Sequence, residues 1–328
     1  MVGTPRRSVI SGAAAPPPVK SSAVTKDLSL ADEPCVVVVS ALGKASRLSA
    51  LDAASLPTKR SPHDALLACI TTTTRTRLGA ITETGVVHSF HASDLPELDT
   101  TKPRWSEGIA LADYLGLASG DGAVRGVIAL NSDVPVMLGT KRGVVKRFIP
   151  SDLSDKSQQP VISLKEGDRV VGAALAPDTD HLVFVSSAGQ LLNFSAGDVR
   201  PQGAGASGVA GISLTADATV ISATSVPRDA ATVVTISGST TQLPGTESAR
   251  AKRTALTEFP TKGRGTSGVR AHSFLKGEDL LRAAFVGLNP RAMGSRGQAV
   301  ALPEEAAKRD ASGTVLEGSV SVLGEQPA

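Results

Sequence analysis

The stretch VMLGTKRGVVKRFIPSDL, residues 136–153, contains two largely apolar runs separated by a short polar turn. Gly143 lies in that turn, with Thr140 three residues before it and Phe148 five residues after it. An apolar run, a Ser/Thr-x-x-Gly turn and a second extended run predict a β-hairpin. Glycine adopts the positive φ that such a turn needs at little steric cost. We therefore interpret residues 136–153 as two antiparallel strands.

The same pattern recurs along the chain at intervals of 42 to 59 residues. Its glycines are Gly43, Gly85, Gly143, Gly189 and Gly238, with a partial sixth copy at Gly297. Three residues before each glycine stands Ser40, Thr82, Thr140, Ser186 or Thr235, and five after it Leu48, Phe90, Phe148, Phe194 or Leu243. Nine after it comes an acid: Asp52, Asp94, Asp152, Asp198 or Glu247. Five copies that agree in several columns indicate a repeat architecture.

Further strand-like runs lie between the hairpins, so each unit has about four strands, and helical periodicity is nearly absent. Six such units predict an all-β, propeller-like disc of six four-stranded blades, because repetition around a circle leaves few exposed strand edges. Two stacked β-sandwiches are the alternative, but they do not explain one template running along the whole chain.

The composition is that of a globular protein, with 41% hydrophobic and 20% charged residues and a net charge of +3. Cys35 and Cys69 lie in apolar runs, which predicts buried thiols in a reducing, cytoplasmic compartment. The apolar runs are all shorter than the roughly 20 residues of a membrane span. We expect a flexible leader or linker remnant over residues 1–30, the repeats over 31–318 and a flexible tail over 319–328.

Two stretches have the G-x-G-x-x-G spacing of dinucleotide-binding proteins. They are Gly203, Gly205 and Gly208, and Gly263, Gly265 and Gly268. That motif needs a strand immediately before it and a helix immediately after it. Here prolines precede both copies and extended sequence follows, so we predict no cofactor. Two readings remain open: a loop whose backbone amides and cations bind phosphate, or an ordinary loop that links blades.

Five segments carry a resemblance to a known family. They are EPCVVVVSALGKASRLSA (33–50), RLGAITETGVVHSFHASDLPEL (77–98), the opening stretch, GDRVVGAALAPDTDHLVFVSSAGQLLNFSAGDVRPQGAGASGVAGISL (167–214), and FPTKGRGTSGVRAHSFLKGEDLL (259–281). These residues resemble the C-terminal β-pinwheel domain of the A subunit of bacterial type IIA DNA topoisomerases, gyrase and topoisomerase IV, in an actinobacterial-like form. The resemblance covers residues 31–318 and implies a six-bladed β-pinwheel.

The resemblance also implies a function, which is to bind and bend double-stranded DNA around a basic rim. The implied partners are DNA, the ATPase B subunit of the topoisomerase and its catalytic A-subunit core. The implied location is cytoplasmic and nucleoid-associated. The cations that match the family's basic hairpin positions are Lys44, Arg47, Lys141, Arg142, Lys146 and Arg147. The loops that would complete the basic rim carry Arg200, Arg250, Lys252, Arg253, Lys262, Arg264 and Arg270, and we add Lys59 and Arg60 as candidate DNA contacts.

One departure from the family concerns the Q-R-R-G-G-K-G box that gyrase A subunits carry in the first blade. The corresponding stretch here is AASLPTKRSPHDALL, residues 53–67, in which Lys59 and Arg60 are the only basic remnants. This difference favours a role like that of topoisomerase IV over tight, gyrase-like wrapping.

The sequence offers little for catalysis. The family's nucleophile is a Tyr preceded by Arg, whereas the single Tyr here, Tyr114, follows Asp113. His88 and His91 are spaced plausibly for a metal but lack a third ligand, so we predict no metal site. Two alternatives to DNA binding are a protein-interaction module, which the modest charge favours, and a repeat enzyme with an axial active site, which lacks converging His or carboxylate groups.

Overall fold

A computed structural model describes residues 31–49, 53–241 and 249–326. These belong to one compact unit, Ala31–Ala328, and the leader expected over residues 1–30 lies outside the described residues. Regular structure in the described part is almost entirely strand, and its one α-helix is the short α1 (Leu111–Tyr114). The all-β prediction is confirmed.

Hairpins recur along the described chain as the repeat predicts. They are β1 (Pro34–Ser40) with β2 (Lys44–Leu48), β4 (Arg77–Thr82) with β5 (Val86–His91), β9 (Val136–Thr140) with β10 (Val144–Phe148), β13 (His181–Ser186) with β14 (Gln190–Ser195), β17 (Thr232–Gly238) with β18 (Arg250–Ala255), and β21 (Pro290–Met293) with β22 (Ala299–Val300). In five turns the template glycine has φ between 73° and 84°. Its N–H donates to the carbonyl three residues earlier at 2.8 to 3.0 Å. Such turns end in a left-handed residue, which explains the glycine.

The fifth hairpin departs from the predicted alignment. Gly238 is the last residue of β17 and lies opposite Leu280, so it is not a turn residue. The β-bulge found at Ser40, Thr82 and Ser186 recurs at Ser237, which therefore takes the place we assigned to Thr235. The turn between β17 and β18 is longer than the other hairpin turns. A template of fixed positions around the glycine could not reveal this difference. The template residues Leu243 and Glu247, like Asp52, lie outside the described residues.

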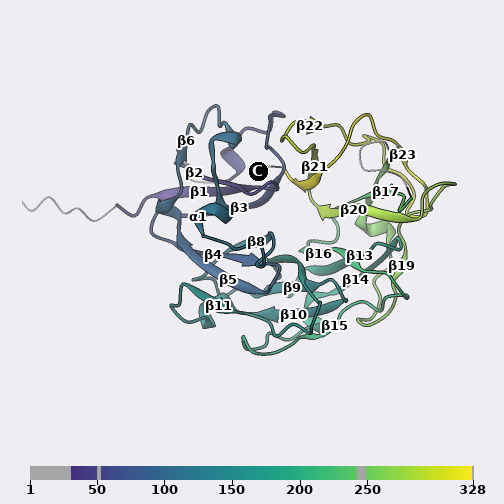
Figure 1. The fold of residues 1–328 in the computed structure, drawn as a ribbon, viewed down its shortest axis with the longest axis horizontal. Coiled ribbons are helices and arrows are strands. Elements are labelled where there is room, and N and C mark those ends of the chain that lie inside the picture. Colours follow the sequence, from purple (N-terminus) through teal and green to yellow (C-terminus); the bar gives the residue numbers. More distant parts are fainter. Residues whose placement is uncertain (1–30, 50–52, 242–248, 327–328) are drawn as a thin grey trace, which may run out of the picture. The chain divides into compact units, whose positions relative to one another are not determined.

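An inner strand pairs with the first strand of each hairpin. The inner strands are β3 (Leu66–Thr73), β8 (Val124–Ala129), β12 (Val170–Leu175), β16 (Val220–Val226), β20 (Leu280–Gly287) and β24 (Val322–Glu325). Each packs against the next, and β24 packs against β3, so the inner strands form a closed ring (Figure 1). We number the sheets built on them blades 1 to 6 in chain order. This arrangement is the propeller-like fold predicted from the repeat.

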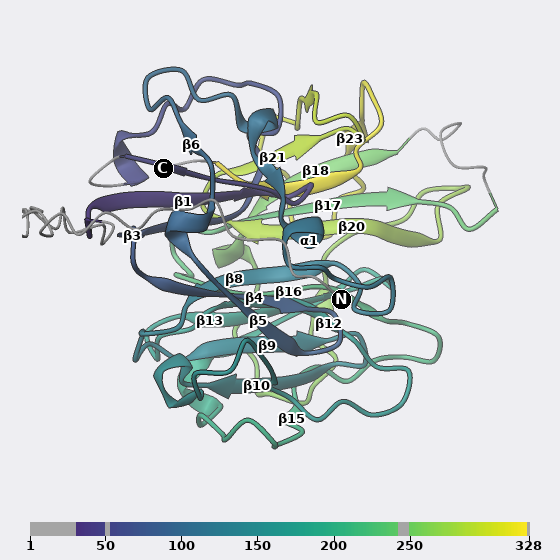
Figure 2. The same ribbon diagram turned by 60° about the vertical axis from the view of Figure 1, so that its left-hand side comes forward.

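The fourth, outer strand of a blade comes from a later part of the chain. The outer strands of blades 1 to 5 are β7 (Ile109–Ala110), β11 (Gln158–Pro160), β15 (Val209–Ala210), β19 (Val269–Arg270) and β23 (Thr314–Val315). Each follows the hairpin of the next blade, so β15 comes after β13 and β14 but pairs with β10 at the lower edge in Figure 2. Blade 1 gains one more short strand, β6 (Glu97–Leu98), parallel to β2. Neighbouring blades are therefore interlocked by strand exchange.

The ring closes between blades 6 and 1 by the same exchange. The chain after β2 passes β22, where the His63 N–H donates to the Gly297 carbonyl at 2.9 Å. β24 pairs with β21 and meets β3 at Glu325 and Leu66. The expectation of a tail beginning at residue 319 is wrong, because residues 322–325 complete blade 6. Sequence alone did not show this, since so short a strand carries no repeat signal.

The hydrophobic core lies mainly between adjacent blades. One cluster joins Met137 and Val145 of blade 3 to Phe184 and Phe194 of blade 4. Further clusters join blades 1 and 2, 2 and 3, 4 and 5, and 5 and 6. Short 3₁₀ turns cap the hairpins or connect them: η1 (Ala53–Ser55), η2 (Ala92–Asp94), η3 (Trp105–Glu107), η4 (Pro150–Asp152), η5 (Ala196–Asp198) and η6 (Leu256–Glu258). The template acids of copies two to four end η2, η4 and η5, which explains their regular position.

Candidate nucleic-acid interface

The segments that lead into the outer strands form the outer edge of the blades. We define outer loop 3 as residues 199–208, which lead into β15, and outer loop 4 as residues 259–268, which lead into β19. The last glycine of each G-x-G-x-x-G stretch has a positive φ and lies against a hairpin strand. A Cβ on Gly208 would meet the Val145 carbonyl at 2.6 Å, and one on Gly268 the Leu191 carbonyl at 2.2 Å. These two glycines permit close strand contact.

Lys146 does not reach the surface, so its predicted direct contact with DNA is wrong. It is fully buried in β10, and its Nζ donates to the carbonyls of Val161 and Gly203 at 2.7 Å, Ala204 at 2.9 Å and Ala206 at 3.0 Å. Burial lowers the pKa of Lys146 to about 8, so the ammonium is still the main form at pH 7. Lys146 holds outer loop 3 against blade 3.

Arg147 is buried for a similar reason, and the prediction that it contacts DNA is also wrong. Its guanidinium donates to the carbonyls of Ala196, Val199 and Ala176 at 2.7 to 2.9 Å and to the Asp178 carboxylate at 2.6 Å. These partners belong to blade 4 and to the segment before it. Strand exchange brings them over β10, which sequence spacing could not show.

Lys252 is the third predicted contact that the structure places inside. It occupies in β18 the position that Lys146 has in β10, and its Nζ donates to the carbonyls of Ala271, Lys308 and Arg309. Burial lowers its pKa to about 8. Buried polar groups are normally hydrogen-bonded, and here a returning outer segment supplies the acceptors.

His272, next to this lysine, should make stability depend on pH. Burial, together with the nearby Lys252 ammonium, lowers the pKa of His272 to about 4 from 6.5. The unfolded chain therefore binds this proton first as the pH falls. The contribution of neutral His272 to the free energy of unfolding is complete above about pH 6.5 and is lost towards pH 4.

Urea unfolding of the protein and of His272→Phe between pH 7.5 and 4 measures this effect. The difference in unfolding free energy between the two proteins should change across that range. A difference that stays constant with pH would contradict the assignment. Burial also lowers the pKa values of His63 and His88. Their pH-dependent contributions to stability are the same in both proteins, so they cancel in the difference.

A second set of predicted cations is exposed and lies on blades 3 and 4. It comprises Lys141, Arg142, Arg200, Lys262, Arg264 and Arg270. They come from separate elements: the β9–β10 turn, outer loops 3 and 4, and β19. Residues 199–216 and 259–277 contain no Asp or Glu, so the positive charge of the two outer loops is not neutralised within them.

A groove of about 270 Å³ runs beside β15, between the β9–β10 turn and outer loop 3. Lys165, which is not among the predicted cations, lines it together with Asp168. Asp168 accepts the Arg142 N–H at 3.0 Å, and Arg264 of outer loop 4 donates to the Ala210 carbonyl at 3.0 Å. Lys165 lies in a stretch of mixed charge, KEGDR, which hid it in the sequence.

The remaining predicted cations lie outside blades 3 and 4, and several of them have partners within the protein. Arg47 pairs with Glu97 at 2.8 Å, Arg60 with Asp64 at 2.8 Å, and Arg250 donates to the Gly313 carbonyl at 3.1 Å. Lys59 is exposed, whereas Lys44 and Arg253 are half-buried. The segment leading to β23 carries Glu304, Glu305 and Asp310. The exposed cations of the predicted set therefore lie mainly on blades 3 and 4. We call Lys141, Arg142, Lys165, Arg200, Lys262, Arg264 and Arg270 the basic arc.

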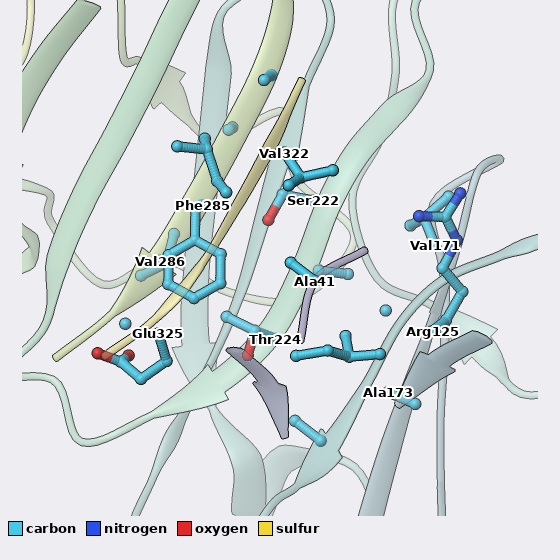
Figure 3. Close-up of a pocket in the computed structure, with 18 of the residues that line it drawn as sticks. Ala41, Arg125, Val171, Ala173, Ser222, Thr224, Phe285, Val286, Val322 and Glu325 are labelled. Atoms are coloured by element: carbon cyan, nitrogen blue, oxygen red, sulfur yellow. The ribbon is translucent and has the colours of Figure 1, made fainter. Parts of the chain in front are cut away.

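The axial pocket, about 610 Å³, is lined by the inner strands (Figure 3). Its ionisable side chains have partners in the protein: Arg125 pairs with Glu83, and Glu325 accepts the Leu288 N–H at 2.8 Å. In the described part of the chain, no three His, Cys, Asp or Glu side chains are grouped for a metal. No helix among the described residues could span a membrane. The interface with the clearest chemistry is therefore the basic arc.

Sequence comparison supports the resemblance. Residues 135–177, 180–227 and 245–286 match a family model described as DNA gyrase C-terminal domain, beta-propeller. The A subunit of DNA gyrase from Mycolicibacterium smegmatis is 32% identical over 213 residues, 63% of this chain and 23% of that protein. The same gyrase subunit from Klebsiella oxytoca is 34% identical over 149 residues, 45% and 16% respectively. The chain spans less than a quarter of the length of these relatives.

Solved structures share the fold. The crystal structure of the C-terminal domain of DNA topoisomerase IV superposes with a TM-score of 0.67 and 19% identity, covering 87% of this chain and 89% of that one. The structure of the DNA gyrase A C-terminal domain gives 0.61 and 18%, covering 89% and 99%. At this identity the likeness concerns the fold, and it agrees with the family match.

Proposed function

We propose that this chain, which belongs to the DNA gyrase C-terminal domain family, binds double-stranded DNA along the outer edges of blades 3 and 4 and bends it. The observation that carries the proposal is the exposed basic arc, whose two outer loops contain no acid. A surface of Lys, Arg and backbone amides suits the phosphate backbone and reads little sequence.

The proposed role is that of a non-catalytic part of the A subunit in a type IIA topoisomerase, which would work with a catalytic core and an ATPase subunit on cytoplasmic, nucleoid DNA. Smooth bending of duplex costs about 1–6 kcal/mol for a site of a few helical turns. Contacts between phosphates and the arc must offset that cost. With Lys165 the arc holds seven exposed cations, so the slope of log affinity against log salt should not exceed about 6 in magnitude.

We further propose bending like that of topoisomerase IV and not tight, gyrase-like wrapping. The segment after β2 occupies the outer edge of blade 6, where the basic box would lie. Arg60 there donates to the Asp64 carboxylate at 2.8 Å and to the Ala292 carbonyl at 2.9 Å. The Arg60 guanidinium therefore connects this segment to blade 6 and is not free to contact DNA. Lys59 is the exposed cation that remains in the segment.

Reversing three charges of the arc, in K262E/R264E/R270E, should weaken duplex binding by about 100-fold or more at moderate salt. Each lost phosphate contact also lowers the salt slope by about 1. Mobility shift of a duplex across a salt series measures both quantities. A matched control reverses three exposed lysines from other outer segments, Lys102, Lys156 and Lys308, and should change affinity by less than about fivefold.

Equal losses in the two triple variants would contradict a localised arc. Absence of any duplex binding at low salt would reject the DNA-binding proposal and leave a protein-interaction module. Circular dichroism of each variant establishes that the fold persists. All six substituted side chains are exposed, so we expect little change in stability.

A further inference from the structure

The buried ammonium of Lys146 lies on the inner side of outer loop 3, and no acidic side chain in the described part of the chain neutralises its charge. The four groups that accept hydrogen bonds from the buried Lys146 Nζ are all backbone carbonyls. Among the described residues, Lys146 has no carboxylate partner. A buried ammonium held only by dipoles leaves a net positive potential at the surface above it.

The direction of these carbonyls fixes the direction of the amides that follow them. The described chain has no cis peptide bond, and in a trans peptide the C=O and the next N–H point in opposite directions. The carbonyls of Gly203, Ala204 and Ala206 point inward to Lys146. The N–H groups of the next residues, Ala204, Gly205 and Ser207, therefore point away from it.

These three amides are free to bind a ligand. Within the described chain none of them donates a hydrogen bond, and Gly205 and Ser207 are exposed. A Cβ on Gly205 would meet nothing within 4 Å, so the surface above it is open. Outward backbone N–H groups over a positive charge form the kind of concavity that binds phosphate.

The other blades lack this combination: at the position of Lys146, blades 1, 2 and 6 carry Ser46, His88 and Val300. In blade 4, Leu192 stands where blade 3 has Lys146, and the Gly265 N–H donates to the Gly211 carbonyl at 2.6 Å. In blade 5, Lys252 holds the Lys308 carbonyl at 3.2 Å, but Asp310 follows in the same segment. The arrangement is therefore specific to outer loop 3, which has no acidic side chain.

We propose that outer loop 3 is a phosphate-binding site in which the N–H groups of Ala204, Gly205 and Ser207 grip one phosphodiester of the DNA backbone. The inference rests on the proposed function and adds a contact made by backbone in place of side chains. Lys146 acts as a positioning residue: it turns the carbonyls inward and supplies charge from below, without touching the ligand.

Two variants of one residue test the site. Gly205→Pro removes one donor, whereas Gly205→Ala keeps it, and the position tolerates a Cβ. We expect Gly205→Pro to weaken duplex binding about tenfold relative to Gly205→Ala, as the loss of a hydrogen bond to a charged group implies. Equal affinities would overturn the assignment.

Amide resonances give an independent readout. In the ¹⁵N-labelled full chain, saturating duplex should shift the Gly205 and Ser207 signals, and inorganic phosphate should shift the same signals at constant ionic strength. Lys146→Met should abolish both shifts. Shifts with inorganic phosphate but none with duplex would overturn the assignment to the DNA backbone.

The outcomes separate this inference from the proposed function. If K262E/R264E/R270E loses duplex binding while Gly205→Pro matches Gly205→Ala, only the backbone site is rejected. If the triple variant binds duplex normally, the basic arc itself is rejected. Should Lys146→Met fail to fold, the Gly205 pair still decides the matter.

Discussion

Replacement of Asp64 by alanine is expected to lower the free energy of unfolding by about 3–5 kcal/mol, the cost of leaving a buried charge without its partner. The Asp64 carboxylate is fully buried and accepts Nε of Arg60 and an Nη of Arg291, each at 2.8 Å. Arg291 is itself buried in β21, and its other Nη donates to the Thr58 carbonyl. The three side chains connect blade 6 to the segment that follows β2.

Urea unfolding followed by circular dichroism measures this loss. Asp178→Ala is the matched control, because Asp178 also pairs with a buried arginine, Arg147, but its own side chain is 77% exposed. Exposed ion pairs contribute about 0–1 kcal/mol, and Arg147 keeps three carbonyl acceptors. Similar losses of unfolding free energy for the two variants would contradict the view that the Asp64 carboxylate stabilises the contact between blade 6 and the segment after β2.

Phe184→Ala should also cost about 3–5 kcal/mol, by leaving a cavity between blades 3 and 4. Phe184 is fully buried in β13 and stacks on Phe194 with ring centroids 6.0 Å apart. A Cβ built on Gly139 or Gly211 would approach the Phe184 ring within 3.0 to 3.2 Å. The ring therefore fills the space that these two glycines of blade 3 leave open.

Phe285→Ala provides the comparison, since Phe285 lines the axial pocket and is only half-buried. Its removal enlarges an existing space, so we expect a loss of less than about 2 kcal/mol. Thermal or urea unfolding of both variants gives the two values. A larger effect at Phe285 would mean that the axial wall, and not the core between the blades, limits stability.

The sequence was informative where structure is local. The turn at Gly143 needs only a hydroxyl residue, two intervening positions and a left-handed glycine. The same pattern located the turns at Gly43, Gly85 and Gly189, and its partial copy located the turn at Gly297. It failed at Gly238 because the fifth turn is longer than the others, so the fixed template selected a glycine two residues before the position that corresponds to Gly143. Repeat spacing therefore predicted the hairpins better than the loops between them.

The candidate site was harder to predict, for a physical reason. Lys141 and Lys146 are five residues apart in one hairpin, yet the first is exposed and the second buried. What buries Lys146 is a loop that returns from about 57 residues later in the chain. No property of the local sequence distinguishes the two lysines. The glycines beside Lys262 and Arg264 suggested a phosphate-binding loop, but an ordinary linking loop explained them equally well.

Strand exchange has a consequence for how force passes through the molecule. Outer loop 3 lies on blade 3 but is covalently continuous with η5 and β14 of blade 4. A duplex that pulls on this loop therefore loads two sheets together, one through hydrogen bonds and the other through the peptide chain. Peeling one blade outward would also strip the edge of the blade before it. In the proposed complex, tension from bent DNA would thus be shared by neighbouring blades, and partial unfolding under load would be opposed where strands are exchanged.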